Sequence, residues 1–157
     1  NECNEGLKIL KKKFNISYFR DIDKFMVETL INRSNVLYSR LRHVIEENQR
    51  VRDIKDQLQK GSIQNIGTIL QESHKSLKSL YEVSCLEIDY MIEILENVEG
   101  WYGGRIIGGG FGGCSIHLVA DKRVEYFINH LINSYKVKYN IVPEIMNISF
   151  PGGLLHL

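Results

Sequence analysis

The chain has 157 residues, a formal net charge of +1, 43% hydrophobic residues and 25% charged residues, which is typical of one globular domain or a large piece of one. The nearly neutral balance argues against nucleic acid or an anionic membrane surface as the main partner, and no apolar run approaches the ~18 residues that span a bilayer. Three cysteines without a Cys-x-x-Cys pair indicate neither a disulfide framework nor a zinc site. Reduced thiols, and so a cytoplasmic location, are expected.

Helical patterns dominate the first 98 residues. Asp21-Ile22-Asp23 has the composition of a helix cap, Ser34 or Asn35 is expected to cap a long helix, and Gly61 is expected to end it. Ser84 and Glu87 have the spacing of a capping box. Apolar spacing predicts a helix over residues 2–14, a short helix after Asp23, a long helix ending at Gly61, a fourth from Ser62 to Tyr81 and a fifth from Ser84 to Val98.

The pattern changes after Gly100, where short apolar runs replace the helical period. Residues 105–107 and 114–119 predict two strands, residues 122–139 a helix, and residues 145–150 and 154–157 two closing strands. A helical first part followed by a β-α-β-β unit predicts an α+β domain.

A dense glycine cluster lies between the first two expected strands. Seven of the 13 glycines fall within residues 103–113. Glycine loses more conformational freedom on folding than any other residue, so such a cluster favours a place where a ligand or another segment approaches bare backbone. The loop has no Gly-Lys-Ser/Thr and does not lead into a helix, which excludes Walker A and Rossmann motifs. We favour a loop beside a ligand over a purely structural turn, with Phe111 packed inward; the loop residues are Gly108, Gly109, Gly110, Phe111, Gly112 and Gly113.

The long helix carries a dense set of polar residues. Arg42 with Glu46, and Glu46 with Arg50, are i,i+4 neighbours, which favours a salt-bridged helix surface. The alternative is that Arg42 and Asn48 reach toward an active site or a domain interface.

Three other polar features have plain interpretations. His74 lies on a mostly apolar face and is expected to be a core or interface histidine rather than a base. Cys114 opens an apolar strand and is expected to be buried and inert. Asp89 and Glu93 share one helix face, but no second pair of carboxylates faces them, so no metal site is predicted.

Four stretches of the chain, taken in order, resemble the galactokinase-type GHMP small-molecule kinases. Residues 103–114 resemble that family's glycine motif, Gly-Ser/Ala-Arg-Met/Leu-Thr-Gly-Gly/Ala-Gly-Phe/Trp-Gly-Gly-Cys. Glu2-Cys3 resembles the Glu/Gln-Cys pair after its sugar-binding region. Residues 42–51 resemble its Arg-His-Val-x-x-Glu-Asn-x-Arg-Val helix, and residues 73–89 its Ser-His-x-Ser-Leu-x-x-x-Tyr-Glu-Val-Ser-Cys-Pro-Glu-Leu-Asp segment.

The resemblance implies a C-terminal domain with a four-stranded antiparallel sheet flanked by helices, spanning residues 1–157. It implies that galactose, ATP and Mg²⁺ are bound mainly by an N-terminal domain outside this chain, and that the catalytic residues lie there too. In that scheme Gly108 to Gly113 form one wall of the cleft, near the sugar or the phosphates. Arg105 would fix the loop by pairing within the sheet or across the interface, with Arg42 and Asn48 in support. The isolated chain is expected to be inactive.

Some positions depart from the family pattern. The threonine of the glycine motif is Ile107 here, and the proline after Ser-Cys is Leu86. Two alternatives to a galactokinase therefore stay open. One is a sensor that binds galactose and ATP without turnover, and the other is a kinase of a related sugar such as N-acetylgalactosamine or arabinose.

Overall fold

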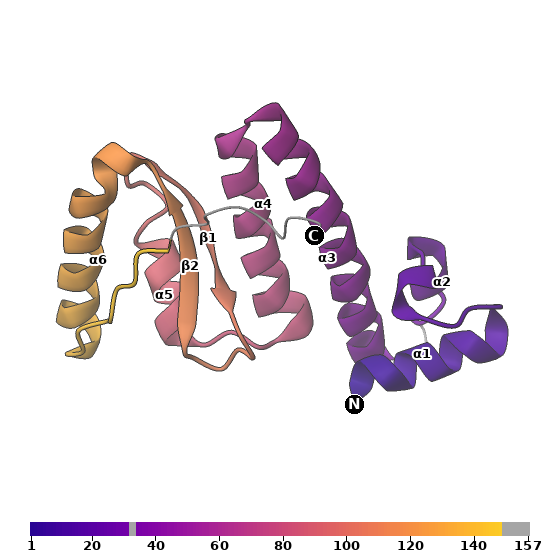
Figure 1. Cartoon of the computed structure of the whole chain (residues 1–157). Helices are drawn as coiled ribbons and strands as arrows, with labels where there is room; N and C mark the ends of the chain where they lie inside the picture. Colours follow the sequence, from indigo (N-terminus) through magenta and orange to yellow (C-terminus); the bar gives the residue numbers. More distant parts are fainter. Residues whose placement is uncertain (32–33, 149–157) are drawn as a thin grey trace, which may run out of the picture.

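The computed structural model describes residues 1–31 and 34–148, and it arranges them as a row of helices with one sheet among them (Figure 1). The sheet lies between α4 on one side and α5 and α6 on the other, while α3 connects this part to α1 and α2 (Figure 1). The helices are α1 (Glu2–Lys13), η1 (Phe19–Asp21), α2 (Lys24–Glu28), α3 (Asn35–Lys60), α4 (Ile63–Ser76), η2 (Leu77–Tyr81), α5 (Leu86–Glu93), η3 (Asp121–Arg123) and α6 (Val124–Tyr139).

Local capping signals place most helix ends where the sequence predicts them. Asp23 accepts a hydrogen bond from the backbone N–H of Met26 at 2.8 Å, and the Ser34 hydroxyl accepts one from Leu37 at 3.3 Å. Gly61 ends α3 in the left-handed conformation, with a φ of +66°.

Two helix predictions in the middle of the chain are wrong in detail. The fourth helix does not continue unchanged to Tyr81, because its last turn, η2, is a π-helix. The fifth begins at Leu86 rather than after a Ser84 cap, since the Ser84 hydroxyl donates instead to the Asp89 carboxylate at 2.5 Å. A charged acceptor five residues away thus displaces the expected capping box.

The two strands around the glycine cluster form an antiparallel pair. β1 (Trp101–Ile107) and β2 (Cys114–Val119) start from the pairing of Ile107 with Cys114, and the register shifts once between Trp101 and Gly103. The expected strand over residues 145–150 shows no strand at its described residues 145–148, and the rest of it lies outside the described residues, as does the expected strand over 154–157. Alternating apolar residues indicate which side of a strand would face the core. They do not provide the adjacent strand whose backbone groups a strand must hydrogen-bond.

A contact between two glycines brings α4 close to the sheet. A Cβ on Gly67 would lie 2.1 Å from the Tyr102 carbonyl oxygen, and one on Gly103 would lie 2.0 Å from the Gly67 carbonyl oxygen. The Gln71 amide also donates to the Tyr102 carbonyl at 3.1 Å. Bare backbone at both positions therefore lets α4 press directly on β1, which fixes the strand that leads into the glycine loop.

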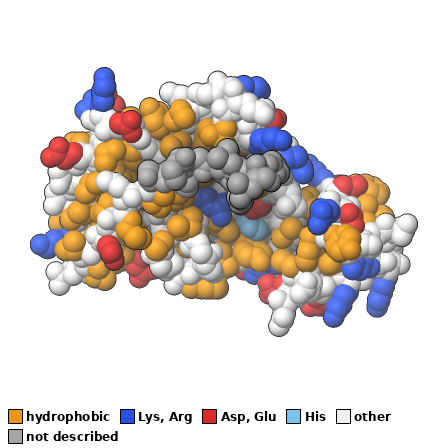
Figure 2. All heavy atoms as spheres, in the orientation of Figure 1, with side chains coloured by type: hydrophobic (Ala, Val, Ile, Leu, Met, Phe, Trp, Pro, Cys, Tyr) orange, Lys and Arg blue, Asp and Glu red, His pale blue; other side chains and the backbone are white. Residues whose placement is uncertain are grey.

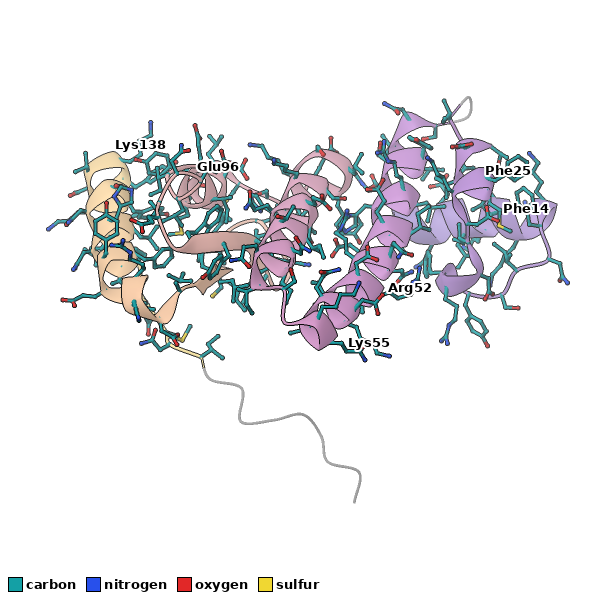
Figure 3. The ribbon with its side chains drawn as sticks, turned by 90° about the horizontal axis from the view of Figure 1, so that it is seen from above. Phe14, Phe25, Arg52, Lys55, Glu96 and Lys138 are labelled. Carbon is teal, nitrogen blue, oxygen red and sulfur yellow. The ribbon has the colours of Figure 1, made fainter. Side chains whose placement is uncertain are left out.

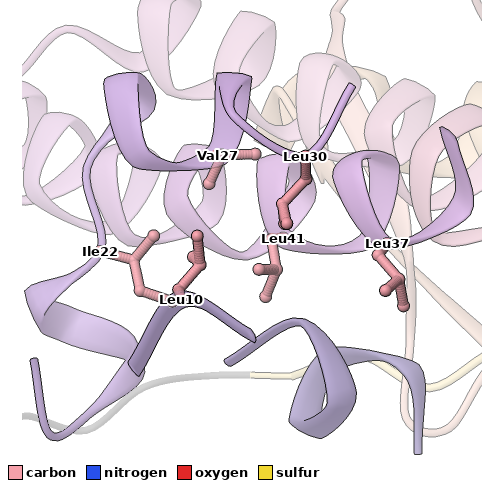
Figure 4. Close-up of a cluster of buried hydrophobic side chains, with 6 residues drawn as sticks. All are labelled: Leu10, Ile22, Val27, Leu30, Leu37 and Leu41. Carbon is pink, nitrogen blue, oxygen red and sulfur yellow. The ribbon is translucent and has the colours of Figure 1, made fainter. Parts of the chain in front are cut away.

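Separate apolar clusters hold the two ends of the row. The first joins α1, α2 and the start of α3, and Phe14 and Phe25 pack edge to face at its rim, with ring centroids 6.4 Å apart (Figure 3). The second joins the sheet with α5 and α6. Buried members of the first are Leu10, Ile22, Val27, Leu30, Leu37 and Leu41 (Figure 4), and those of the second are Ile92, Leu95, Trp101, Phe127 and Leu131.

Charge is spread over one face of the molecule rather than gathered (Figure 2). On the face in Figure 2, acidic and basic side chains alternate among hydrophobic ones, and no single basic field covers that face. Within the described parts of the chain, no helix is both long and apolar enough to cross a membrane.

Candidate functional site at the glycine loop

The glycine loop joins β1 to β2 through backbone that favours glycine. Gly108, Gly110, Gly112 and Gly113 have φ values of +78°, +85°, +108° and +91°, and Phe111 has +59°, so five of the six residues of the turn lie where an L side chain is strained. A hairpin needs one or two such residues. The excess indicates that the backbone path itself is what the sequence specifies.

One side of the loop rests on Val83. The backbone N–H of Phe111 donates to the Val83 carbonyl at 2.7 Å, and a Cβ on Gly110 would lie 2.4 Å from that same oxygen. Only glycine at position 110 therefore allows this approach.

The other side of the loop is open. A Cβ built on Gly108, Gly109, Gly112 or Gly113 would meet no atom of the described residues within 4 Å. Bare backbone without a packing neighbour can accept a close ligand, and N–H groups of such turns suit phosphate oxygens.

Phe111 does not pack inward as predicted. Its side chain is 77% exposed, and its backbone has a φ of +59°. The left-handed conformation lets the amide of Phe111 reach Val83 while the ring projects outward. The backbone is thus the anchor of this loop, and the side chain is left free for a contact outside the described residues.

Arg105 pairs with the helices beneath the sheet. Its guanidinium donates to the Glu47 carboxylate at 2.9 Å and to the Ser73 hydroxyl at 2.6 Å. Arg50 holds the same carboxylate at 2.6 Å. Burial works to raise the pKa of Glu47, but the hydrogen bonds and charges of its neighbours outweigh it and hold that pKa below its usual range. Arg105 therefore joins β1, α3 and α4 within the chain.

Arg42 and Asn48 lie away from this group. Arg42 forms an exposed ion pair with Glu46 at 2.7 Å, and Asn48 is exposed. The salt-bridged surface favoured from the sequence is confirmed for Arg42, and Glu46 also lies 3.7 Å from Arg50. Among residues 1–31 and 34–148, neither Arg42 nor Asn48 takes part in the contacts that hold the loop.

The long helix carries a second, inward polar face, which the sequence pattern did not separate from the exposed salt-bridged one. Arg40, His43, Glu47 and Arg50 follow one another at intervals of three, four and three residues, which places them on one side of α3. His43 is 6% exposed, stacks on the Tyr81 ring and lies 2.8 Å from the Ser76 hydroxyl. Burial lowers the pKa of His43 to about 4. The three- and four-residue spacing of these polar side chains is the feature of the sequence that could have predicted this face.

His74 is a core histidine, as predicted. It is 4% exposed, its Nδ1 accepts from the Ile106 backbone N–H at 3.4 Å, and its Nε2 lies 3.3 Å from Asp89. Burial lowers the pKa of His74, so the neutral ring donates from Nε2 to the carboxylate. Asp89 also pairs with Lys78 at 2.8 Å, a role that the sequence did not indicate.

Cys114 is exposed rather than buried. Its position at the first residue of β2, directly after the open glycines, keeps it outside the apolar layer. In residues 1–31 and 34–148, no group of three or more His, Cys, Asp or Glu side chains is arranged to hold a metal ion.

Comparisons with known proteins assign the fold. Residues 54–133 match the family described as "GHMP kinases C terminal". The galactokinase of Thermotoga neapolitana is 39% identical over 153 residues, which cover 98% of this chain and 42% of that protein. The galactokinase of Enterococcus faecalis is 34% identical over 155 residues, which cover 97% of this chain and 40% of that protein.

A solved structure agrees with these relatives. The crystal structure of Lactococcus lactis galactokinase complexed with galactose superposes with a TM-score of 0.83 at 30% identity, covering 90% of this chain and 37% of that one. The chain thus spans about two fifths of the length of the curated relatives that it matches. It belongs to the GHMP kinase family and has the fold of that family's C-terminal domain.

Proposed function

We propose that this chain is the C-terminal domain of a galactokinase-type sugar kinase. The complete polypeptide would transfer the γ-phosphoryl group of MgATP to the anomeric hydroxyl of galactose. The relatives that support this proposal are named galactokinases, and one solved neighbour is complexed with galactose.

The observation that carries the proposal is the two-sided glycine loop. Phe111 and Gly110 fix one side on Val83, while Gly108, Gly109, Gly112 and Gly113 leave the other side bare. Phosphoryl transfer depends chiefly on positioning and on stabilising charge rather than on covalent chemistry by the protein. The loop backbone, held on Val83, would position the substrates. Its open side can lie against the sugar or the nucleotide phosphates.

The remaining machinery would come from a second domain. We assign neither the catalytic base nor the loop that wraps the ATP phosphates to any residue described above. Mg²⁺ would be bound together with ATP. Leu86, three residues after Val83, is 78% exposed. Phe111, whose backbone N–H donates to the Val83 carbonyl, is 77% exposed. Exposed apolar side chains of this size suit a covering partner, so we place the second domain over this region. The isolated chain would then be inactive.

Ile107 is a position at which this chain departs from the glycine motif of the family that it resembles. It is partly buried and pairs with Cys114 at the mouth of the loop, where the related kinases carry a threonine hydroxyl. Replacing a hydroxyl by a β-branched hydrocarbon removes one hydrogen-bonding group from the cleft wall.

The test is ADP release by the complete polypeptide with MgATP and, separately, galactose, N-acetylgalactosamine or arabinose. We expect turnover with galactose, and none from the isolated chain. Turnover with only one of the other sugars would support a sugar kinase but show that galactose is not its substrate. Binding of galactose and ATP without turnover would contradict the kinase and indicate a sensor.

A further inference from the structure

The loop's resting place is itself an irregular piece of backbone. Residues 80–84 run from the last two residues of the π-helix η2 into irregular backbone, where Glu82 has a φ of +58° and the Val83 N–H donates back to the Leu77 carbonyl at 3.1 Å. A segment outside regular helix or strand keeps one shape only where other groups hold it. The glycine loop is therefore only as well placed as residues 80–84 are.

Arg40 holds the first half of this segment. Its side chain is 10% exposed, and it donates from Nη1 to the Leu80 carbonyl at 2.6 Å and from Nη2 to the Glu82 carboxylate at 2.5 Å. Its Nε donates to the Glu2 carboxylate of α1 at 2.7 Å, so the same guanidinium also connects α1 to this segment. The planar guanidinium serves three acceptors at fixed angles, which a lysine ammonium does not reproduce.

Asp89 holds the second half. Its Oδ1 accepts from the Ser84 hydroxyl at 2.5 Å and from His74, and its Oδ2 pairs with Lys78. The side chain is 15% exposed. Burial works to raise the pKa of this carboxyl, but Lys78 and Ser84 outweigh it and hold the pKa below its usual range. Asp89 is thus an ionised acceptor for groups on α4, η2 and the 80–84 segment.

We infer that Arg40 and Asp89 are positioning residues of this kinase, which hold residues 80–84 from both ends so that the Val83 carbonyl sets the glycine loop. Neither residue contacts the open side of the loop, so each acts through Val83 and the Phe111 amide. The inference deepens the proposed function and rests on it. Arg40 and Asp89 are largely buried while their partners Glu2, Glu82 and Lys78 are exposed, so these ion pairs contribute little net stability but can hold residues 80–84 in one geometry.

The test compares Arg40→Lys and Asp89→Asn in the complete polypeptide with two exposed controls on α3, Arg52→Lys and Asp56→Asn. An atomic misplacement of about 1 Å costs about 100-fold in rate, so we expect kcat to fall at least about tenfold in both test variants. The KM values for ATP and galactose should change little, because the loss lies in transition-state geometry. Both controls should match the parent.

A second measurement reads the loop directly. The exchange rate of the Phe111 amide proton, followed by NMR, should rise severalfold in the test variants, because its bond to Val83 would open more often. Reduced kcat with unchanged Phe111 exchange, or unchanged kcat in folded variants, would overturn the inference. If a test variant fails to fold, Ser84→Ala removes one bond to Asp89 alone and must show the same two changes in weaker form.

The exchange measurement also separates the two proposals. If the parent shows no turnover, the kinase proposal fails, whereas faster Phe111 exchange in the variants still supports the loop's dependence on Arg40 and Asp89. Unchanged exchange in that case overturns the positioning inference as well.

Discussion

Histidines whose pKa is lowered by burial, above all His43 and His117, should make the stability of this chain fall steeply between pH 7 and pH 5. Burial lowers the pKa of His43 to about 4 and that of His117 to about 4. Around His43 lie Ser76, Tyr81 and the Glu47–Arg50–Arg105 group, and the His117 ring accepts from the Trp101 indole at 3.2 Å and lies 2.8 Å from the Ser115 hydroxyl. A proton on either ring would disrupt these contacts.

The sign and size of the effect follow from the shifts. An unfolded histidine gains its proton near pH 6.5, while the folded one stays neutral down to about pH 4, so acid favours the unfolded chain in this interval. At pH 5 the difference amounts to about 2 kcal/mol for each ring relative to pH 7, or about 4 kcal/mol together. That corresponds to a drop in Tm of roughly 10 °C for a chain of this length.

The assay is thermal and urea unfolding of the chain from pH 7.5 to pH 4.5. His43→Gln provides the internal check, because it removes one titrating ring. The variant should be less stable at pH 7, yet on going to pH 5 it should lose about 2 kcal/mol less stability than the parent. A stability that stays level between pH 7 and pH 5, or an unchanged pH slope in the variant, would refute this reasoning.

Two further substitutions test the support of the site. Gly67→Ala should cost about 1–3 kcal/mol by urea unfolding, since its Cβ would meet the Tyr102 carbonyl at 2.1 Å, whereas Thr68→Ala on the exposed side of α4 should be nearly neutral. Equal effects of the two would contradict the close contact of α4 with β1. Arg105→Met should cost about 1–3 kcal/mol in the same assay because it leaves Ser73 and Glu47 short of a donor, and a cost below about 0.5 kcal/mol would show that this pairing is incidental.

Local chemistry explains what the sequence predicted well. Asp23, Ser34 and Gly61 satisfy backbone groups within a few residues of themselves, so their roles as helix caps do not depend on the rest of the fold. The strands on either side of the glycine loop were also visible, because short β-rich runs bounded by glycines are a local signal.

Contacts between distant residues explain what the sequence missed. Arg40 bonds to Leu80 and Glu82, which lie 40 and 42 positions further along the chain. Arg105 bonds to Glu47, 58 positions away, so no local pattern could predict these pairs. Phe111 was expected to pack inward because apolar residues usually do. The left-handed backbone of the loop instead directs its amide to Val83 and leaves its ring exposed.

The central claim is that the open side of the glycine loop faces a ligand. Gly109→Ala in the complete polypeptide tests it most directly, because Gly109 is outside the positive-φ region and its Cβ would meet none of the described atoms within 4 Å. The account predicts a Tm within about 2 °C of the parent, as expected for an unstrained surface position, with kcat/KM for galactose phosphorylation reduced at least about tenfold. Normal turnover by a stable Gly109→Ala protein would show that the loop is only a structural turn.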